Sequence, residues 1–186
     1  MRCSITFSLV ALVGLVGMVI PVRAGTLSGT FDGSSTLTPT GTQGVYSQTF
    51  TGDGDDTTYG AFTPSSLSSI DFSHPPNITI SGGTFTETFA GGTLLGTGSG
   101  AGTASGQGTA TFTLDYVITG GTGFFAGATG EITLTGTITQ TSPTTESISN
   151  GSYTGSFTTP EPSSLALIAL GAAGLAAYGF RRQRVG

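Results

Sequence analysis

The central part of this chain has no lysine and no arginine. Residues 25–159 instead hold nine acidic residues, which gives this segment a formal charge of −9: Asp32, Asp53, Asp55, Asp56, Asp71, Glu87, Asp115, Glu131 and Glu146. Proteins bind phosphate groups chiefly through cationic side chains. The absence of such side chains excludes nucleic acid as a partner and disfavours anionic lipid headgroups.

Cysteine and histidine occur only once each. Cys3 lies at the N-terminus, so the central part has no disulfide, no thiolate nucleophile and no cysteine-ligated metal. A single histidine, His74, rules out a multi-histidine metal centre. It precedes Pro75-Pro76 without a serine or aspartate partner pattern, and we interpret it as a surface residue in a loop. The sequence also lacks a phosphate-binding glycine motif and a nucleophile elbow, so we expect no cofactor and no catalytic residue.

The N-terminus, residues 1–24, has the pattern of a secretory signal peptide. A positively charged start is followed by an almost wholly apolar run from Ile5 to Ile20, which Pro21 ends. Val22-Arg23-Ala24 places small or medium residues before the expected cleavage site between Ala24 and Gly25. The alternative is an uncleaved membrane anchor.

The C-terminus carries three features in a fixed order. Pro160-Glu161-Pro162 comes first, Leu165 to Phe180 is an uncharged run, and the basic residues Arg181, Arg182 and Arg184 follow. At ~1.5 Å rise per residue the run is slightly short for a ~30 Å hydrocarbon core, but its flanking residues make a span over 163–182 feasible. The positive-inside rule then places the arginines in the cytoplasm and the body outside it.

This arrangement over residues 160–186 resembles the PEP-CTERM sorting signal of bacterial exported proteins. The resemblance implies that an exosortase, a membrane-embedded cysteine transpeptidase-like enzyme, recognises Pro160, Glu161 and Pro162 and processes the anchor. It also implies an association with extracellular polysaccharide and biofilm. The two prolines keep the tripeptide extended and accessible. A permanent tail anchor would share the topology and differ only in keeping its helix.

Residues 25–159 alternate with the period of two that is typical of β-strands, as in Phe112, Leu114, Tyr116 and Ile118. Turn signals include Gly52-Asp53-Gly54, Gly82-Gly83 and Asn150-Gly151. The short links predict an all-β antiparallel meander that closes into a barrel, with a β-sandwich as the alternative. The glycine-rich segment 96–108 is either a flexible loop or a strand poor in side chains. The expected strands are 26–32, 45–51, 57–63, 67–73, 77–81, 84–90, 93–104, 108–119, 130–141 and 151–158.

Residues 120–132, Gly-Gly-Thr-Gly-Phe-Phe-Ala-Gly-Ala-Thr-Gly-Glu-Ile, are similar to a segment of the allene oxide cyclase and dirigent-like β-barrels. The glycines suit a turn that needs positive φ, followed by a strand packed closely on Phe125. The resemblance implies a barrel fold, and it transfers no catalytic residue.

Glu87 shares its parity with Phe85 and Phe89, so we expect its carboxylate to face the interior. A buried carboxylate has a raised pKa, which makes Glu87 the one candidate for an interior ligand site. The alternatives are a carboxylate at the barrel mouth and a strand register that differs from the one assumed. Asp53, Asp55 and Asp56 lie in an expected loop and form a weak calcium candidate, although a solvated turn explains them better.

These features favour a non-enzymatic protein of the cell envelope or extracellular matrix, with the secretion machinery, an exosortase and the membrane as partners. The body would lie outside the cytoplasm and then reach the cell surface or the medium. The alternatives are a small-molecule-binding barrel and a cyclase-like or isomerase-like barrel enzyme. A deep pocket holding Glu87 would favour these alternatives, whereas a filled interior would favour the first.

Overall fold

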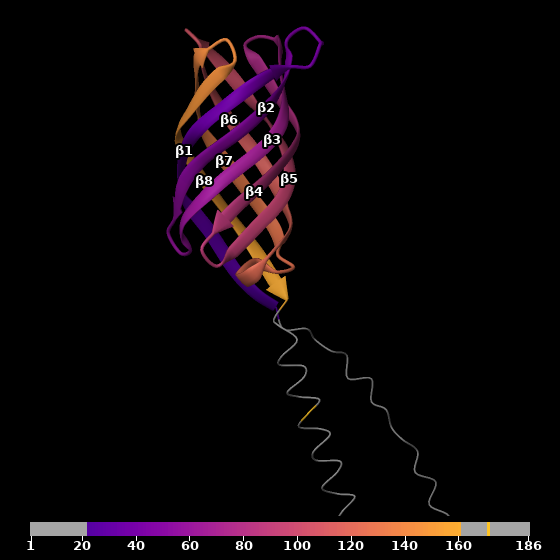
Figure 1. Ribbon diagram of the computed structural model, residues 1–186, viewed down its shortest axis with the longest axis vertical. Coiled ribbons are helices and arrows are strands. Elements are labelled where there is room, and N and C mark those ends of the chain that lie inside the picture. The colour runs from indigo at the N-terminus through magenta and orange to yellow at the C-terminus, as the bar shows by residue number, and fades with distance from the viewer. Residues whose placement is uncertain (1–21, 161–170, 172–186) are drawn as a thin grey trace, which may run out of the picture.

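The computed structural model describes residues 22–160 and residue 171. Eight strands form one closed antiparallel barrel in chain order, and β1 pairs with β8 to close it (Figure 1). The predicted barrel is thereby confirmed over the β-sandwich. The elements are β1 (Val22–Pro39), β2 (Val45–Asp56), β3 (Gly60–His74), β4 (Asn77–Phe89), β5 (Gly92–Gly106), β6 (Thr109–Gly121), the 3₁₀ turn η1 (Gly123–Phe125), β7 (Thr129–Ser142) and β8 (Thr145–Pro160).

Two pairs of expected strands are single strands in the structure. The ranges 67–73 and most of 57–63 lie in β3, and 77–81 with most of 84–90 lie in β4. The expected turn at Gly82-Gly83 is an irregularity inside β4, where Gly82 has φ +60° and the pairing with β5 shifts register. A bulge of this kind accommodates a residue with positive φ while the strand continues. The two glycines therefore form a bulge within β4 and not the turn that their sequence suggests.

The expected turns at Gly52-Asp53-Gly54 and Asn150-Gly151 are also wrong. The first lies within β2 and the second within β8, where Asn150 has φ +51°. Gly52 lies where a side chain has no room, because a Cβ there would overlap the carbonyl oxygen of Asp32 on β1. A glycine inside a strand often marks such a close approach of another backbone.

The glycine-rich segment 96–108 is strand as far as Gly106. Its inner face lacks side chains because rings from neighbouring strands cover it. A Cβ at Gly96 would overlap the ring of Phe85 and the carbonyl oxygen of Val117, and one at Gly98 would lie 2.6 Å from Cδ1 of Tyr116. The inner face of β5 contributes almost no side-chain volume, and the large rings of the neighbouring strands fill the barrel interior in front of its glycines.

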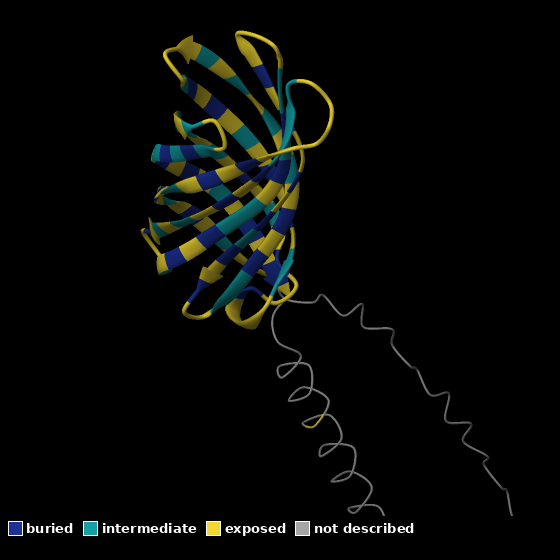
Figure 2. Cartoon of the chain, turned by 45° about the horizontal axis from the view of Figure 1, so that its top comes forward, coloured by how far each residue is buried: buried dark blue, intermediate teal, exposed yellow. Residues whose placement is uncertain are grey.

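Alternation of buried and exposed residues runs along the strands, as the dark blue and yellow bands of Figure 2 show. At the end where Val22 pairs with Pro160, Tyr59, Phe89, Phe125 and Phe157 pack ring against ring. We call this the closed end. The expected tight turn of residues 120–132 is found here, with φ +58° at Gly123 and +70° at Gly127 on either side of the buried Phe125.

The opposite end carries the turns at residues 40–44, 75–76, 107–108 and 143–144. We call this the open end. Both ends of the barrel segment 22–160, the indigo start of β1 and the orange arrowhead of β8 in Figure 1, lie at the closed end. Any feature of the open end therefore faces away from the point where residues 161 onward begin.

Candidate functional site

Three carboxylates lie inside the barrel: Asp56 on β2, Glu87 on β4 and Glu146 on β8, each only 3% exposed. A buried carboxylate costs free energy unless it is hydrogen-bonded, paired or protonated. Among residues 22–160 no lysine or arginine other than Arg23 occurs, and Arg23 lies over the Phe124 ring at the closed end. Each of the three carboxylates must therefore be accommodated by means other than a basic side chain.

Asp56 is fully hydrogen-bonded. Its Oδ1 accepts from the backbone amides of Thr58 at 2.7 Å and Tyr59 at 2.8 Å, which shapes the β2–β3 turn. Its Oδ2 accepts from the amide of Ser28 at 3.0 Å and the hydroxyl of Tyr153 at 2.6 Å. Four donors from three segments make this aspartate a structural group that ties the turn to β1 and β8.

Glu146 belongs to a buried polar network that crosses the barrel near its open end. Its Oε2 accepts hydrogen bonds from Oγ of Ser35 at 2.7 Å and Nε2 of Gln48 at 2.8 Å. Oε1 of Gln48 accepts in turn from Oγ of Ser68 at 3.2 Å. The four residues come from β8, β1, β2 and β3, which are neighbours in the closed barrel. The network holds one side of the Glu146 carboxylate and leaves Oε1 without a donor among the described residues.

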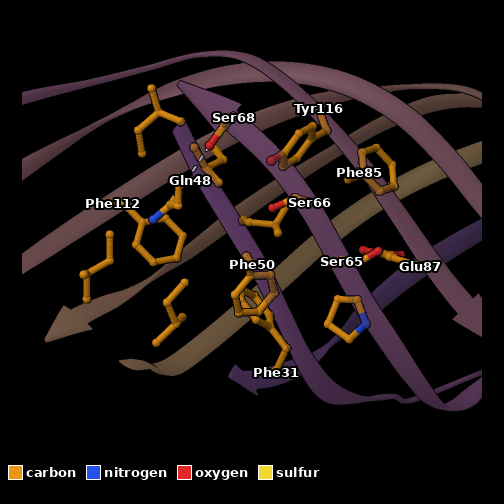
Figure 3. Close-up of a pocket in the computed structure, with 16 residues that line it drawn as sticks. Phe31, Gln48, Phe50, Ser65, Ser66, Ser68, Phe85, Glu87, Phe112 and Tyr116 are labelled. Atoms are coloured by element: carbon orange, nitrogen blue, oxygen red, sulfur yellow. Dashed lines mark hydrogen bonds between the residues drawn. The ribbon is translucent and has the colours of Figure 1, made fainter. Parts of the chain in front are cut away.

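Glu87 is buried, as its parity indicates, and its Oε2 has no hydrogen-bond partner among the described residues. Burial raises its pKa to about 8, and the negative charge of Asp56 adds to the effect. Glu87 is therefore predominantly protonated at neutral pH, which removes most of the cost of burying it. Figure 3 shows its side chain at the edge of a cavity that Phe85 and Tyr116 also line.

This central cavity has a volume of about 40 Å³. It has room for a few water molecules, and it is far smaller than the pockets that hold organic ligands. Phe31, Phe50 and Phe112 occupy much of the surrounding interior, and the Gln48–Ser68 pair lies toward its other side (Figure 3). Burial also raises the pKa of Tyr116, so its hydroxyl remains protonated. The region around Glu87 is thus nearly filled.

A second cavity lies at the open end and has a volume of about 350 Å³. We call it the mouth cavity. Its lining is mainly apolar and includes Leu37, Tyr46, Phe72, Ile78 and Ile138. Glu146 is the acidic residue in that lining, and Ile138 lines the central cavity as well. The Glu146 network therefore lies next to the larger of the two cavities.

The structure does not bring the weak calcium candidate together. Asp53 and Asp55 are exposed on the outer face of β2, whereas Asp56 points inward, because successive residues of a strand face opposite sides. Within residues 22–160 no group of three potential ligand residues has the geometry to hold a metal ion. His74 is exposed at the end of β3, where its Nδ1 lies 2.8 Å from Oγ of Ser73.

Asp56 and Glu146 were missed as interior residues by the sequence reasoning. Each lies an even number of positions from an apolar residue that faces inward, Asp56 from Phe50 and Glu146 from Ile148, and therefore lies on the same face of its strand. The sequence pattern predicts a strand that ends at residue 51, which places Asp56 in a loop. If the alternation of inward and outward residues is continued past Gly52 and Gly54, Asp56 falls on the inner face.

The predicted cleavage site lies inside a strand of the structure. Ala24 pairs with Thr158 and Gly25 with Phe157 in the β1–β8 seam. Residues 1–21 of the predicted signal peptide lie outside the described residues, as do Glu161, Pro162, Arg181, Arg182 and Arg184. Pro160 is the last residue of β8 and pairs with Val22.

Residues 158–183 match the family model of the PEP-CTERM protein-sorting motif. No curated protein and no solved structure was found to be similar to the chain. The motif marks the chain as an exported protein that an exosortase recognises. Within the part of the chain that the structure describes, no helix is long and apolar enough to cross a membrane. The similarity of residues 120–132 to allene oxide cyclase and dirigent-like barrels stays a prediction, apart from the barrel fold itself.

Proposed function

We propose that this protein is a non-enzymatic barrel of the bacterial cell surface or extracellular matrix, delivered there by exosortase sorting. One observation carries the proposal: β8 runs directly into the sorting motif, which begins at residue 158. A folded barrel that ends at the motif would be displayed beside the membrane on the side away from the cytoplasm. In this proposal residues 1–24 act as a signal peptide and residues 163–182 as the membrane anchor before processing.

The interior of the barrel supports a non-enzymatic role. Glu87, the one acid that sequence reasoning singled out for chemistry, borders a cavity of only about 40 Å³. An organic substrate does not fit there, so a cyclase-like or isomerase-like reaction at Glu87 is disfavoured. Asp56 is saturated by four donors and has no free oxygen to act as a base.

The proposed setting is a hydrated matrix that contains extracellular polysaccharide. This part rests on the PEP-CTERM resemblance, and the outer surface is compatible with it. Hydroxyl side chains pair across neighbouring strands on the outside, as Thr135 does with Ser152 at 2.9 Å and Thr129 with Thr158 at 3.2 Å. Co-sedimentation of the exported protein with polysaccharide from the same cells would test the association. Recovery of the protein free of polysaccharide would contradict it.

A second candidate function is the binding of a small molecule inside the barrel. The mouth cavity favours it, since about 350 Å³ lies within the range of ligand pockets and barrel mouths are frequent ligand sites. This function is compatible with sorting to the surface, because the open end faces away from the motif.

Intact-mass analysis of protein recovered from membranes and medium tests the sorting proposal. In a host with an exosortase, the wild type should lose mass at both ends and leave the membrane fraction. Glu161→Ala should keep its C-terminal mass and stay in the membrane, because the apolar run and the arginines are unchanged. Replacing Arg181, Arg182 and Arg184 together should instead weaken retention before processing.

Glu131→Ala is the matched control, since Glu131 is an exposed glutamate on β7. It should be processed like the wild type. A wild-type protein that keeps its full C-terminal mass and remains membrane-bound would be a plain tail-anchored protein, and the sorting proposal would then be wrong.

A further inference from the structure

We propose that the mouth cavity binds a small organic ammonium ion, with the apolar part of the ligand against the cavity wall and its N–H groups on Glu146. The proposal rests on the second candidate function, small-molecule binding, and names the class of ligand for it. It is independent of how the protein is sorted.

The first support is the free oxygen of a buried acid. Glu146 is 3% exposed and lines the mouth cavity. Its Oε2 takes two hydrogen bonds, from Ser35 at 2.7 Å and Gln48 at 2.8 Å, which hold the carboxylate in one orientation. Its Oε1 has no donor among the described residues. A carboxylate fixed on one side and open on the other is a preorganised acceptor for a ligand that brings its own donors.

The second support is the sign of the charge around the cavity. Glu146 is the one acidic residue in the cavity lining, and the one arginine among residues 22–160 lies at the closed end over the Phe124 ring. Asp71, on the outer face of β3, and the exposed His74 both lie outside the cavity lining, and no basic side chain is among the described residues that line it. An anionic ligand would meet uncompensated repulsion there, whereas a cation would supply the missing counter-charge for Glu146.

The third support is the composition of the wall. Tyr46 and Phe72 both line the cavity and pack edge to face, with ring centroids 5.9 Å apart. Aromatic rings attract cations and also pack against apolar groups. Together with Leu37 and Ile78 they favour a ligand with an apolar body and one charged end over a bare metal ion. A single carboxylate is also too few ligands for Ca²⁺, which takes about six to eight oxygens.

Isothermal titration calorimetry on the full chain in phosphatidylcholine nanodiscs tests the proposal, with empty nanodiscs as the blank. The probes are benzylamine, benzyl alcohol and benzoate, which share one apolar body and differ in charge. At neutral pH benzylamine should bind saturably and about tenfold or more tightly than benzyl alcohol, and benzoate should bind most weakly.

Two variants locate the site. Glu146→Gln keeps an acceptor for Ser35 and Gln48 but removes the charge, so the affinity for benzylamine should fall about tenfold or more while that for benzyl alcohol changes little. Ala104→Phe puts a ring into the cavity lining and should abolish binding of both. Glu131→Gln removes the same charge from the outer face and should leave every affinity unchanged. Thermal melting of each variant shows whether it is folded.

The outcomes separate the two levels of the proposal. Equal binding of benzylamine and benzyl alcohol, lost in Ala104→Phe, would keep small-molecule binding and overturn the ammonium preference. An unchanged benzylamine affinity in a folded Glu146→Gln, or binding of either probe that survives in a folded Ala104→Phe, would also overturn the proposal. Absence of saturable binding for all three probes would overturn small-molecule binding in the mouth cavity as well. If Glu146→Gln fails to fold, the comparison of the three probes and the result for Ala104→Phe still test the proposal.

Discussion

The hydroxyl of Tyr153 donates a 2.6 Å hydrogen bond to Oδ2 of Asp56, a residue 97 positions away in the sequence. The bond joins β8 to the end of β2 across β1, inside the closed end of the barrel. Burial and this bond both raise the pKa of Tyr153, so its proton stays in place. The pair therefore acts as a fixed tie across the seam where the barrel closes.

Replacing Asp56 by alanine should destabilise the barrel. The substitution leaves three backbone amides and the Tyr153 hydroxyl without their acceptor, and we expect the free energy of unfolding to fall by about 3 kcal/mol or more. Urea denaturation followed by circular dichroism measures the loss. Asp53→Ala on the outer face of the same strand is the control and should change it by less than about 0.5 kcal/mol. Equal effects of the two substitutions would show that the Asp56 bonds contribute nothing.

Glu87 should make the barrel less stable as the pH rises. Its pKa is about 8 in the folded protein and near 4.5 in the unfolded chain, so between these values the folded state holds the extra proton. The free energy of unfolding should then fall with rising pH, by up to about 1.4 kcal/mol per pH unit, and level off above pH 8.

Glu87→Gln isolates this effect because it keeps the shape of the protonated acid and cannot ionise. Relative to the wild type it should gain stability steadily from about pH 5 to pH 8. Glu131→Gln, on the exposed face of β7, should keep the wild-type slope. The measurement is urea denaturation at a series of pH values. Parallel curves for the wild type and Glu87→Gln would show that Glu87 titrates normally.

Gly96→Ala should be strongly destabilising although it adds one methyl group. The new Cβ would overlap the ring of Phe85 and the backbone carbonyl of Val117, and the backbone cannot rotate away as a side chain can. We expect a cost of about 2 kcal/mol or more, read from the urea midpoint. Gly120→Ala meets no atom within 4 Å and serves as the control. A near-neutral Gly96→Ala would mean that β5 lies farther from β4 and β6 than these overlaps imply.

Processing of the N-terminus should leave Gly25 as the first residue. Cleavage after Ala24 removes the Arg23 contact with the Phe124 ring and the pairs from Val22–Pro160 to Ala24–Thr158, but β1 still starts at the Gly25–Phe157 pair. We therefore expect the mature barrel to stay closed. N-terminal sequencing of the exported protein measures the site. A chain that begins with Met1 would instead indicate an uncleaved anchor.

Much of the architecture could be predicted because its signals are local. The inward row of Phe112, Tyr116 and Ile118 follows from a period of two, and the sorting motif follows from the order of features at the C-terminus. The positions of the turns were harder to predict from the sequence. Glycines that relieve close backbone approach, as at Gly52, look the same in the sequence as glycines that form turns.

The local pattern of residues is enough to predict an all-β body without internal cations, an inward Glu87 and a C-terminus that an exosortase recognises. The closure of the sheet between β1 and β8, and the pairing of each buried acid with its donors, follow only from the three-dimensional fold. Ser35 and Glu146 are 111 positions apart, and no local period relates them. Their contact depends on the register of the closing seam, and so do the filled centre and the open mouth. When the barrel closes, strands that are distant in the sequence line one interior. The combined volume of their side chains then determines where that interior is filled and where a cavity remains.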